Sequence, residues 1–592
     1  MNPHVSSQTK TIMERALSLA TIEESDPELD SNDSYIPDDD DLEISDNDTD
    51  SEIELLVDEP EEQPGPSTMP SSGDKYFGKK KCFIWEKTPL QSASQTRHHN
   101  VIKEHLSSRE GPARALGNKA TPKQAWDLFF TPEMIDEIVK HTNVKLTEMR
   151  RKIQFDDSPA YKNTENDELN ALLGLILLCC IFKSLNESLH SLFYTSIIGR
   201  PIFRAIMTEK RCSVLLRALR FDDSQTRKTR EEIDKAACIS NIFNLFIENC
   251  KRNYSLGAYA TIDETLVPFR GRVKFRVCMP NKPSKYGIKV MCLTDAHNAY
   301  LYNAYVYTGK GSDGLTLSAQ ERNLTIPSQS VIRLTKCIYG TNRNITCGNW
   351  FTSIELATEL KKHKLTLVGT VKKNKPQIPP EFLPSKNREI GSTLYGFTKD
   401  NTLISYVPKK DKAVILLSTM HHSICTDISN KPEIISFYNA TKSGVDTLDM
   451  KCKAYSPNRK TRRWPLVIFY HLIAVASSNA HIIYEMYPEN KKKSRYDFIL
   501  EIALSLCNSY MKKRLQIPNL PEELKKIIKE AVGEQEAEQN TSRAPMSDRL
   551  EKRRNCRFCP YKKNRMTSYK CVKCGTPICL EHAKKTCDIC IQ

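Results

Sequence analysis

The chain has 592 residues, enough for three or four domains, and its hydrophobic fraction of 39% is ordinary for a globular protein. Its net charge of +15 divides unevenly, because residues 1–74 hold 2 basic and 22 acidic residues while residues 75–592 hold 85 basic and 50 acidic ones. A body this positive predicts a polyanionic partner, first of all nucleic acid. We expect neither a secreted nor a membrane protein, because the N-terminus lacks a signal-type apolar core and the longest apolar runs fall short of the ~20 residues of a membrane span.

The first 108 residues read as a disordered acidic tail that ends in a basic linker. Half of the residues from Glu23 to Glu62 are acidic, and such self-repelling charge cannot bury enough apolar surface to offset chain entropy. The linker begins at Lys79, in KKKCFIWEK. The tail has two possible roles: a mimic of nucleic acid that shields the basic body, or a solubilising segment without a specific role.

Helical patterns follow up to residue 257. Thr121-Pro122 and Thr131-Pro132 each place a capping hydroxyl before a proline at the first helical position. Apolar residues at helical spacing predict further helices over Glu168–Phe182, Lys210–Leu219 and Lys235–Lys251. We expect this region to be a basic helical domain that binds DNA, against the alternative that most of its residues serve packing only.

Strand-like patterns begin at Ala258. Runs rich in β-branched and aromatic residues predict strands over Tyr259–Val267, Phe275–Cys278, Gly287–Thr294, Tyr300–Tyr307, Ser330–Leu334, Asn344–Cys347 and Leu365–Val371. A helix is expected over Ser353–Lys362. Several strands followed by strand, helix and strand predict an α/β sheet.

The first of these strands carries the pair Asp263–Glu264, and a dense run of cations without an acidic residue follows it, from Arg270 to Lys289. A carboxylate on a strand beside such a run suits a metal ion that works on a phosphate backbone. The alternative is a buried strand followed by a solvated basic loop.

The C-terminal segment has the spacing of a zinc module. It contains four pairs with two residues between the members of each pair: Cys556 and Cys559, Cys571 and Cys574, Cys579 and His582, and Cys587 and Cys590. Eight ligands suit two tetrahedral Zn²⁺ sites, and metal-coupled folding explains how so short a segment holds a structure. Spacing alone leaves open whether the pairs combine sequentially or in an interleaved order.

Six motifs in order closely resemble the piggyBac-type DNA transposases: TIDETLVPFRGR, NKPSKYGIK, NRNITCGNWFTSIELA, LVGTVKKNK, YNATKSGVDTLD and RKTRRWP. The resemblance runs from about Arg109 to the last cysteines. It implies an RNase H-like catalytic domain, interrupted by an insertion and flanked by a split helical domain for DNA binding and dimerisation. It also implies cut-and-paste chemistry at TTAA sites by three aspartates and two divalent metal ions, and the interleaved pairing of the zinc ligands.

Carried onto this chain, the first aspartate falls on Asp263 and the third on Asp446, with Asp449 one helical turn later. The second falls on Gly348, because NITCGNWFTS replaces the family's NITCDNWFTS. Glycine supplies neither a ligand nor a charge for Mg²⁺, which requires oxygen ligands in a strict octahedral arrangement. We therefore expect impaired catalysis with Mg²⁺ only weakly held, unless Glu264, Asp295 or a water recruits the metal.

DNA contacts do not depend on that aspartate. Lys282, Lys285 and Lys289 match the family motif, Lys372 and Lys375 match positions that contact target DNA in the family, and a last group precedes a helix start at Pro465. The full predicted set comprises Arg270, Arg272, Lys282, Lys285, Lys289, Lys372, Lys375, Arg459, Lys460, Arg462 and Arg463. For any single member the alternative is a solvated charge.

The sequence thus predicts an α/β RNase H-like domain with an insertion, a split mainly-α domain, a zinc-binding cysteine-rich domain and an acidic N-terminus. The expected boundaries are 1–108, 109–257, 258–371, 372–432 (insertion), 433–455, 456–533, 534–553 (linker) and 554–592. We expect a homodimeric nuclear protein that binds double-stranded DNA at transposon ends and TTAA targets, with impaired strand transfer. The alternatives are an active cut-and-paste transposase and a zinc-module protein-interaction factor.

Overall fold

The computed structural model describes residues 43–44, 74–81, 83–89, 106–153, 158–184, 186–195, 199–280, 282–426, 431–533, 549–571 and 576–583. The chain forms two compact units, Met1–Arg514 and Leu515–Gln592. The predicted acidic tail lies almost wholly outside the described residues.

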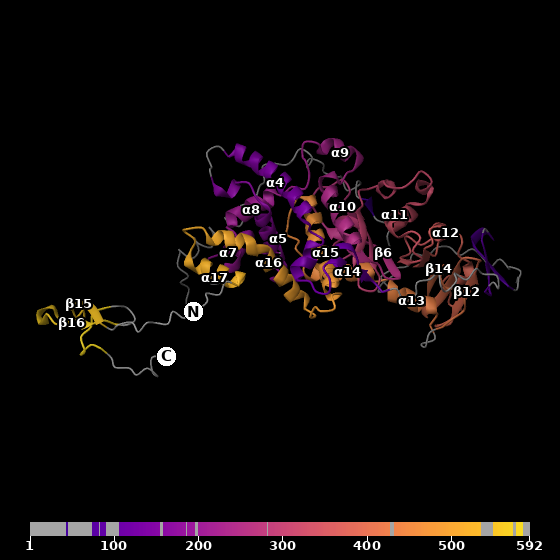
Figure 1. Ribbon diagram of the computed structural model, residues 1–592. Helices are drawn as coiled ribbons and strands as arrows, with labels where there is room; N and C mark the ends of the chain where they lie inside the picture. The colour runs from indigo at the N-terminus through magenta and orange to yellow at the C-terminus, as the bar shows by residue number, and fades with distance from the viewer. Residues whose placement is uncertain are drawn as a thin grey trace, which may run out of the picture. The chain divides into compact units, whose positions relative to one another are not determined.

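The N-terminal half of the first unit is helical, as predicted (Figure 1). Thr121 starts the second of these helices with a capping box, in which its side chain accepts from the amide of Gln124 and Gln124 bonds back to the Thr121 amide. The helices are α2 (Gly111–Ala115), α3 (Pro122–Asp127), α4 (Pro132–Lys152), α5 (Asn166–Ile181), α6 (Leu189–Leu192), α7 (Pro201–Ile206), α8 (Glu209–Ala218), α9 (Arg227–Ile233) and α10 (Ala237–Arg252).

Two later helices, α15 (Trp464–Glu485) and α16 (Arg495–Leu515), return to this helical region. α15 packs against α3 and α10, and the Cys507 thiol of α16 donates to the Ala171 carbonyl of α5. α15 is long and apolar enough to cross a membrane, yet it is buried along its length, as the core helix of a globular fold would be. Arg211 of α8 and Glu168 of α5 form a buried ion pair at 2.5 Å that joins two helices of the same region.

The centre of the unit is a twelve-stranded mixed sheet. Its hydrogen-bonded order is β1-β7-β8-β6-β10-β11-β14-β13-β12-β3-β2, and β9 also pairs with β8. The strands are β1 (Glu43–Ile44), β2 (Lys75–Phe77), β3 (Ile84–Glu86), β6 (Tyr259–Pro268), β7 (Val277–Cys278), β8 (Tyr286–Asp295), β9 (Leu301–Val306), β10 (Asn344–Cys347), β11 (Thr366–Thr370), β12 (Thr393–Phe397), β13 (Thr402–Lys409) and β14 (Lys412–Ser418). A two-stranded sheet of β4 (Ser108–Arg109) and β5 (Tyr254–Ser255) lies apart from it in the pairing.

Strands β9, β8 and β6 form an antiparallel meander, and β10 and β11 then run parallel to β6. The helix α12 (Ile354–Lys362) connects β10 to β11, as the sequence predicts. After the insertion strands, α13 (Glu433–Thr441) and α14 (Gly444–Ala454) pack on the sheet, and α14 contacts both β6 and β8. The carboxylates discussed below come from β6 and α14.

Two sequence-based predictions differ from the structure. Ser330–Leu334 is not a strand but part of α11 (Ile326–Thr335), because Thr325 and Pro327 begin a helix whose buried residues fit helical spacing better than alternation. The basic linker also contains a hairpin, β2 and β3, that joins the sheet edge through the pairing of Glu86 with Phe397. The sequence did not predict this hairpin, because the charged residues around its apolar side chains indicated a linker.

The predicted domain boundaries stay predictions, although the strands on both sides of residue 372 belong to one sheet. β11 pairs with β14 antiparallel, and β14, β13 and β12 continue the sheet. The second unit contains α17 (Glu522–Val532) and a hairpin of β15 (Arg549–Asn555) and β16 (Met566–Tyr569).

Candidate functional site

One face of β6 carries the first predicted carboxylate. The side chains of Thr261, Asp263 and Thr265 alternate onto this face, since side chains two residues apart share a side of a strand. The Thr261 hydroxyl donates to the carbonyl of Thr441, the last residue of α13, at 2.6 Å. The side-chain hydroxyl of Thr441 lies 2.8 Å from the hydroxyl of Thr346 on β10. The face with Asp263 is therefore the one covered by α13 and α14.

Helix α14 brings Asp446 and Asp449 to this face. The Thr265 hydroxyl donates a hydrogen bond to the Asp449 carboxylate, which is half-buried. Asp446 lies one turn earlier, with 67% of its side chain exposed. The three predicted carboxylates thus gather along one edge of α14, although their exposure differs.

Lys282 lies among these carboxylates. Its Nζ is 3.9 Å from Asp446 Oδ1 and 3.5 Å from the Glu264 carbonyl oxygen. Burial lowers the pKa of Lys282, but the charges of Asp263, Glu264, Asp446 and Asp449 outweigh burial and raise it. The ammonium therefore stays charged and offsets part of the negative charge of the group.

Burial also acts on two of the acids. Burial, together with the neighbouring Glu264 charge, raises the pKa of Asp263 well above its usual value, although Lys282 and the Glu264 amide act the other way. That amide donates to Asp263 Oδ1 at 2.9 Å. Burial raises the pKa of Asp449 to about 6, against the hydrogen bond from Thr265 and the charge of Lys282. Both carboxyls favour the neutral form more than exposed aspartates do.

A hollow of about 400 Å³ opens beside the group, lined by Lys282, Pro283, Asp446, Asp449, Met450 and Lys453. Sequence reasoning missed Met450 and Lys453. Their positions, four and seven residues after Asp446, place them on the same side of α14, so the helical period was the available signal.

Gly348 directly follows Cys347, which pairs with Ile262 on the parallel strand β6. One further step along the register places Gly348 beside Asp263, on the face that Thr346 also shares. A Cβ built on Gly348 would meet nothing within 4 Å. The position expected for the second aspartate is therefore adjacent to the first, is sterically open, and carries no side chain.

The proposed substitutes for this aspartate do not lie on that face. Glu264 alternates to the opposite side of β6. Asp295 pairs with Ala260, which shares that opposite side. Its carboxylate accepts hydrogen bonds from the Tyr254 hydroxyl at 3.0 Å and from the Gly257 amide at 2.8 Å. Asp295 is thus a structural residue of the strand end.

The donor set fits poorly with a pair of divalent ions. Within the described residues, the one group of three or more His, Cys, Asp or Glu side chains whose ligand atoms all lie within 4.8 Å of one another is at the C-terminus, and it does not include Asp263, Asp446 or Asp449. Two-metal chemistry needs carboxylates that hold ions roughly 4 Å apart. Here one ligand position is glycine and an ammonium lies among the remaining acids.

The predicted DNA-contacting cations differ in how far they are exposed to solvent. The exposed ones are Arg270, Arg272, Lys285, Lys460 and Arg462. Lys282, Lys372 and Lys375 are half-buried, whereas Lys289 is buried, with its Nζ 4.3 Å from the ring centre of Tyr307 and 5.4 Å from that of Trp350. The structure therefore places Lys289 in an aromatic environment inside the fold rather than on a surface.

The cations of the RKTRRWP motif are of two kinds: some bond backbone carbonyls of the fold, and others are exposed. Arg459 donates to the carbonyls of Ser184 and Glu187, and Arg463 donates to those of Leu216 and Leu219. Ser184 and Glu187 follow α5, whereas Leu216 and Leu219 lie in and directly after the last turn of α8, where unpaired carbonyl groups attract cations. Lys460 and Arg462, between and beside them, remain exposed.

The Cys/His quartet in the second unit combines the first and third ligand pairs. Cys556, Cys559, Cys579 and His582 place their ligand atoms within 4.8 Å of one another. The Cys559 and Cys579 sulfurs are 3.8 Å apart, and His582 Nδ1 is 3.7 Å from Cys559 Sγ. Tetrahedral Zn²⁺ with Zn–S of about 2.3 Å requires sulfurs roughly 3.8 Å apart. The quartet can therefore hold a metal ion.

Combining pairs one and three is the interleaved order rather than the sequential one. The Cys579 amide also donates to Cys556 Sγ at 3.3 Å, which favours a thiolate there. Of the second predicted quartet, Cys571 is described, whereas Cys574, Cys587 and Cys590 lie outside the described residues.

Comparison with known proteins identifies the family. The family described as Transposase IS4 matches residues 121–481, more than half of the chain. The chain belongs to this family. It is of the piggyBac type: a cryo-EM structure of a piggyBac transposase synaptic complex with hairpin DNA matches with a TM-score of 0.69 and 36% identity, over 82% of this chain and 100% of that one.

Two curated relatives of Homo sapiens are more distant. PiggyBac transposable element-derived protein 3 is 22% identical over 400 residues, which is 62% of this chain and 62% of that protein. The Chimeric ERCC6-PGBD3 protein is also 22% identical over 400 residues, which is 35% of its length. The chain thus spans about three fifths of the first relative and about a third of the second.

Proposed function

We propose that the protein is a transposase-derived DNA-binding protein whose strand-transfer chemistry is impaired. The observation that carries this proposal is the placement of Gly348 beside Asp263, on the face where α14 supplies Asp446 and Asp449. The site keeps the arrangement of a carboxylate centre but lacks one of the three side chains that the family uses.

The sheet supports the scaffold half of the proposal. The order β9-β8-β6-β10-β11, with three antiparallel strands followed by two strands parallel to β6, fits the RNase H-like domain that the family resemblance implies. Asp263 lies on the central strand of this group. Both helices that follow the insertion strands return to the same sheet.

Charge and comparison support the DNA-binding half. Residues 75–592 hold 85 basic and 50 acidic residues, and five of the predicted DNA-contacting cations are exposed. The structural neighbour was determined in complex with hairpin DNA. We infer that this chain also binds double-stranded DNA, with an affinity that falls steeply as salt rises.

The impairment follows from ligand chemistry. Hydrolysis and strand transfer through two metal ions need carboxylates on both sides of the scissile phosphate. Thr346 lies on the same face as Asp263, but it offers a neutral hydroxyl that is already hydrogen-bonded to the Thr441 hydroxyl. When bound, divalent ions would supply charge stabilisation and an activated water, and Asp263, Asp446 and Asp449 are the residues that would hold them. Without a carboxylate at 348 we expect weak Mg²⁺ binding.

The test compares the wild-type protein with Gly348→Asp on a duplex that carries matching transposon ends. A gel shift measures DNA binding, and an excision and strand-transfer assay with Mg²⁺ measures chemistry. We expect equal binding and at least about a hundredfold faster cleavage by Gly348→Asp, comparable to the loss of a major catalytic group. Measurable cleavage by the wild-type protein at the rate of Gly348→Asp would instead support an active cut-and-paste transposase.

We propose three further points, which rest on the sequence and not on the geometry of the carboxylate site. The C-terminal quartet holds Zn²⁺ as one of two structural sites, the protein acts in the nucleus, and it forms a homodimer on DNA. Metal analysis of the purified chain, fractionation of expressing cells and the mass of the DNA complex test these three points separately.

A further inference from the structure

The hairpin of β2 and β3 is bound to the insertion strands by close contacts. Trp85 is fully buried, and its indole Nε1 donates to the carbonyl of Gln377 at 2.9 Å. A Cβ on Gly78 would lie 2.7 Å from the Pro376 carbonyl oxygen, and one on Gly396 would lie 3.0 Å from Trp85 Cβ. A side chain at Gly78 would force the backbone apart, and one at Gly396 would be tightly packed against Trp85, so the hairpin lies close to the loop and to β12 at two points.

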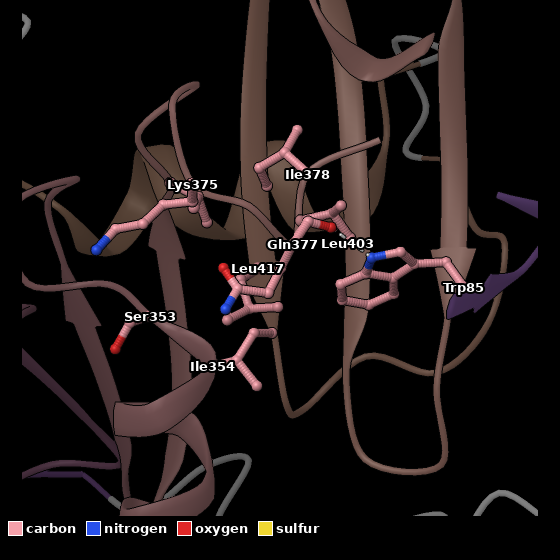
Figure 2. A pocket seen from close by; sticks show the side chains of 9 residues that line it. Trp85, Ser353, Ile354, Lys375, Gln377, Ile378, Leu403 and Leu417 are labelled. Carbon is pink, nitrogen blue, oxygen red and sulfur yellow. Dashed lines mark hydrogen bonds between the residues drawn. The ribbon is translucent and has the colours of Figure 1, made fainter. Parts of the chain in front are cut away.

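Ring contacts extend this attachment. Tyr76 meets Phe382 edge to face, with ring centres 5.1 Å apart, and Phe83 lies 5.0 Å from Trp85. Figure 2 shows Trp85 pointing from the hairpin toward Gln377 and Leu403, with Lys375 across the same hollow. The hollow is about 10 Å³, room for at most one water molecule. The contact is therefore a packed interface within the chain.

The loop that Trp85 holds carries two of the predicted DNA contacts. Residues 372–378 turn back on themselves through the Lys375 amide to the Lys372 carbonyl, at 3.2 Å, and the Ile378 amide to the Lys375 carbonyl, at 3.1 Å. The stem of Lys375 lines the hollow, while its ammonium points away from Trp85 (Figure 2). Near its C-terminal end, this loop presents the Gln377 carbonyl, which accepts the hydrogen bond from the Trp85 indole N–H.

We propose that the hairpin of residues 74–87 positions the loop of residues 372–378, so that Trp85 sets the placement of Lys372 and Lys375 on DNA. The proposal rests on the DNA-binding function proposed above. Trp85 is a positioning residue, since it acts through the loop. The hairpin then contributes to DNA binding through the loop rather than through its own contacts with DNA.

The alternative is that the hairpin contacts DNA itself, because Lys79 and Lys81 lie exposed at its turn. Two sets of variants of the full chain distinguish these possibilities. Trp85→Phe keeps a buried ring and removes the N–H donor, and Gly396→Val displaces Trp85 from the other side. Lys79→Ala with Lys81→Ala removes the cations of the turn and leaves Trp85 intact.

The readout is the slope of log K against log salt for a labelled duplex, between about 50 and 200 mM, where each lost phosphate contact lowers the slope by about 0.9. We expect Lys372→Ala with Lys375→Ala to lower the slope by ~1–2. Trp85→Phe and Gly396→Val should each lower the slope measurably, and by no more than the loss of both lysines does. Neither should lower it further when combined with Lys372→Ala and Lys375→Ala. Lys79→Ala with Lys81→Ala should leave it unchanged.

Hydrogen exchange gives a second readout that does not need DNA. In Trp85→Phe, peptides that cover 372–378 should exchange faster, while peptides that cover β10 and β11 keep their rates. A wild-type chain that does not bind DNA would overturn the proposed function itself. With wild-type binding intact, an unchanged slope in Trp85→Phe and Gly396→Val, or additive losses with the lysine pair, would overturn the positioning role alone.

Discussion

The hydroxyl of Thr265 on β6 donates a hydrogen bond to the carboxylate of Asp449 on α14. This bond joins the strand that carries Asp263 to the helix that carries the other two acids. It also favours the ionised form of Asp449, against the burial that raises the pKa of that carboxyl to about 6. The pair therefore links the geometry of the site to its protonation.

This linkage predicts a pH-dependent stability. The pKa of Asp449 is higher in the folded chain than the ordinary value of 3.8, so the folded state holds more protons between these pH values. Its contribution is fully present below pH ~4 and is lost as pH rises through about 6, by roughly 1–2 kcal/mol after allowance for partial exposure. Melting temperatures from pH 4 to 7.5 should show this loss in wild type and not in Asp449→Asn.

Thr265→Val sharpens the same experiment. Removing the donor withdraws support from the ionised carboxylate, so the pKa of Asp449 rises further. The loss of stability then begins at the same pH, near ~4, but is larger and extends to a higher pH. A pH profile identical to that of wild type would contradict the role assigned to this hydrogen bond.

Replacing two glycines near the site with alanine should change the stability of the fold by very different amounts. A Cβ on Gly348 meets nothing within 4 Å, whereas one on Gly369 of β11 would lie 2.2 Å from Thr352 Oγ1 and 2.6 Å from the Cys347 carbonyl oxygen. Gly348→Ala should change the free energy of unfolding by less than about 1 kcal/mol. Gly369→Ala should destabilise by ~2 kcal/mol or more, as overpacked interiors do. Urea denaturation measures both, and equal effects would contradict the open environment of Gly348.

The RKTRRWP motif predicts a separation of stability from binding. Arg463→Ala should lower the melting temperature, because its guanidinium bonds carbonyls at the C-terminal end of α8, those of Leu216 and Leu219. Lys460→Ala and Arg462→Ala should leave the melting temperature within about 1 °C, since exposed substitutions rarely exceed about 0.5 kcal/mol. Each should lower the salt slope of DNA binding by about 0.9 if it contacts one phosphate. A reversed pattern would contradict the assignment.

Removal of metal should act on the second unit. A chelator, or Cys579→Ser, should abolish the ordered hairpin of β15 and β16, because structural Zn²⁺ supplies much of the folding free energy of such modules. Metal analysis should give two Zn²⁺ per wild-type chain and fewer in Cys579→Ser. A wild-type chain without zinc, and with unchanged circular dichroism after chelation, would contradict the metal role of the quartet.

Much of the fold was predictable from local patterns. Caps and apolar spacing predicted α3, α5, α8, α10 and α12 to within a few residues, since hydrophobic period and capping residues act locally. Ser330–Leu334 was wrongly predicted as a strand, because five apolar and polar residues do not distinguish strand from helix without Pro327 and Thr325 before them.

The sequence predicted site residues but not how they are arranged, and the roles assigned to them stay predictions. The motifs indicated Asp263, Asp446 and Asp449, yet the location of Lys282 among them depends on how β8 and α14 pack. The burial of Lys289 and the carbonyl contacts of Arg459 and Arg463 were likewise invisible, because the sequence does not show which side of a basic segment faces the fold. The hairpin at residues 74–87 depends on contacts with residues some 300 positions away.

The continuity of the sheet from β6 to β2 has a mechanical consequence. Between the strand of Asp263 and the hairpin of Trp85, every step is a hydrogen-bonded strand pair. A load applied to β12, β13 or β14 is shared across backbone hydrogen-bond ladders that lead to β6. We therefore expect such a load to reach the strand of Asp263 through these ladders.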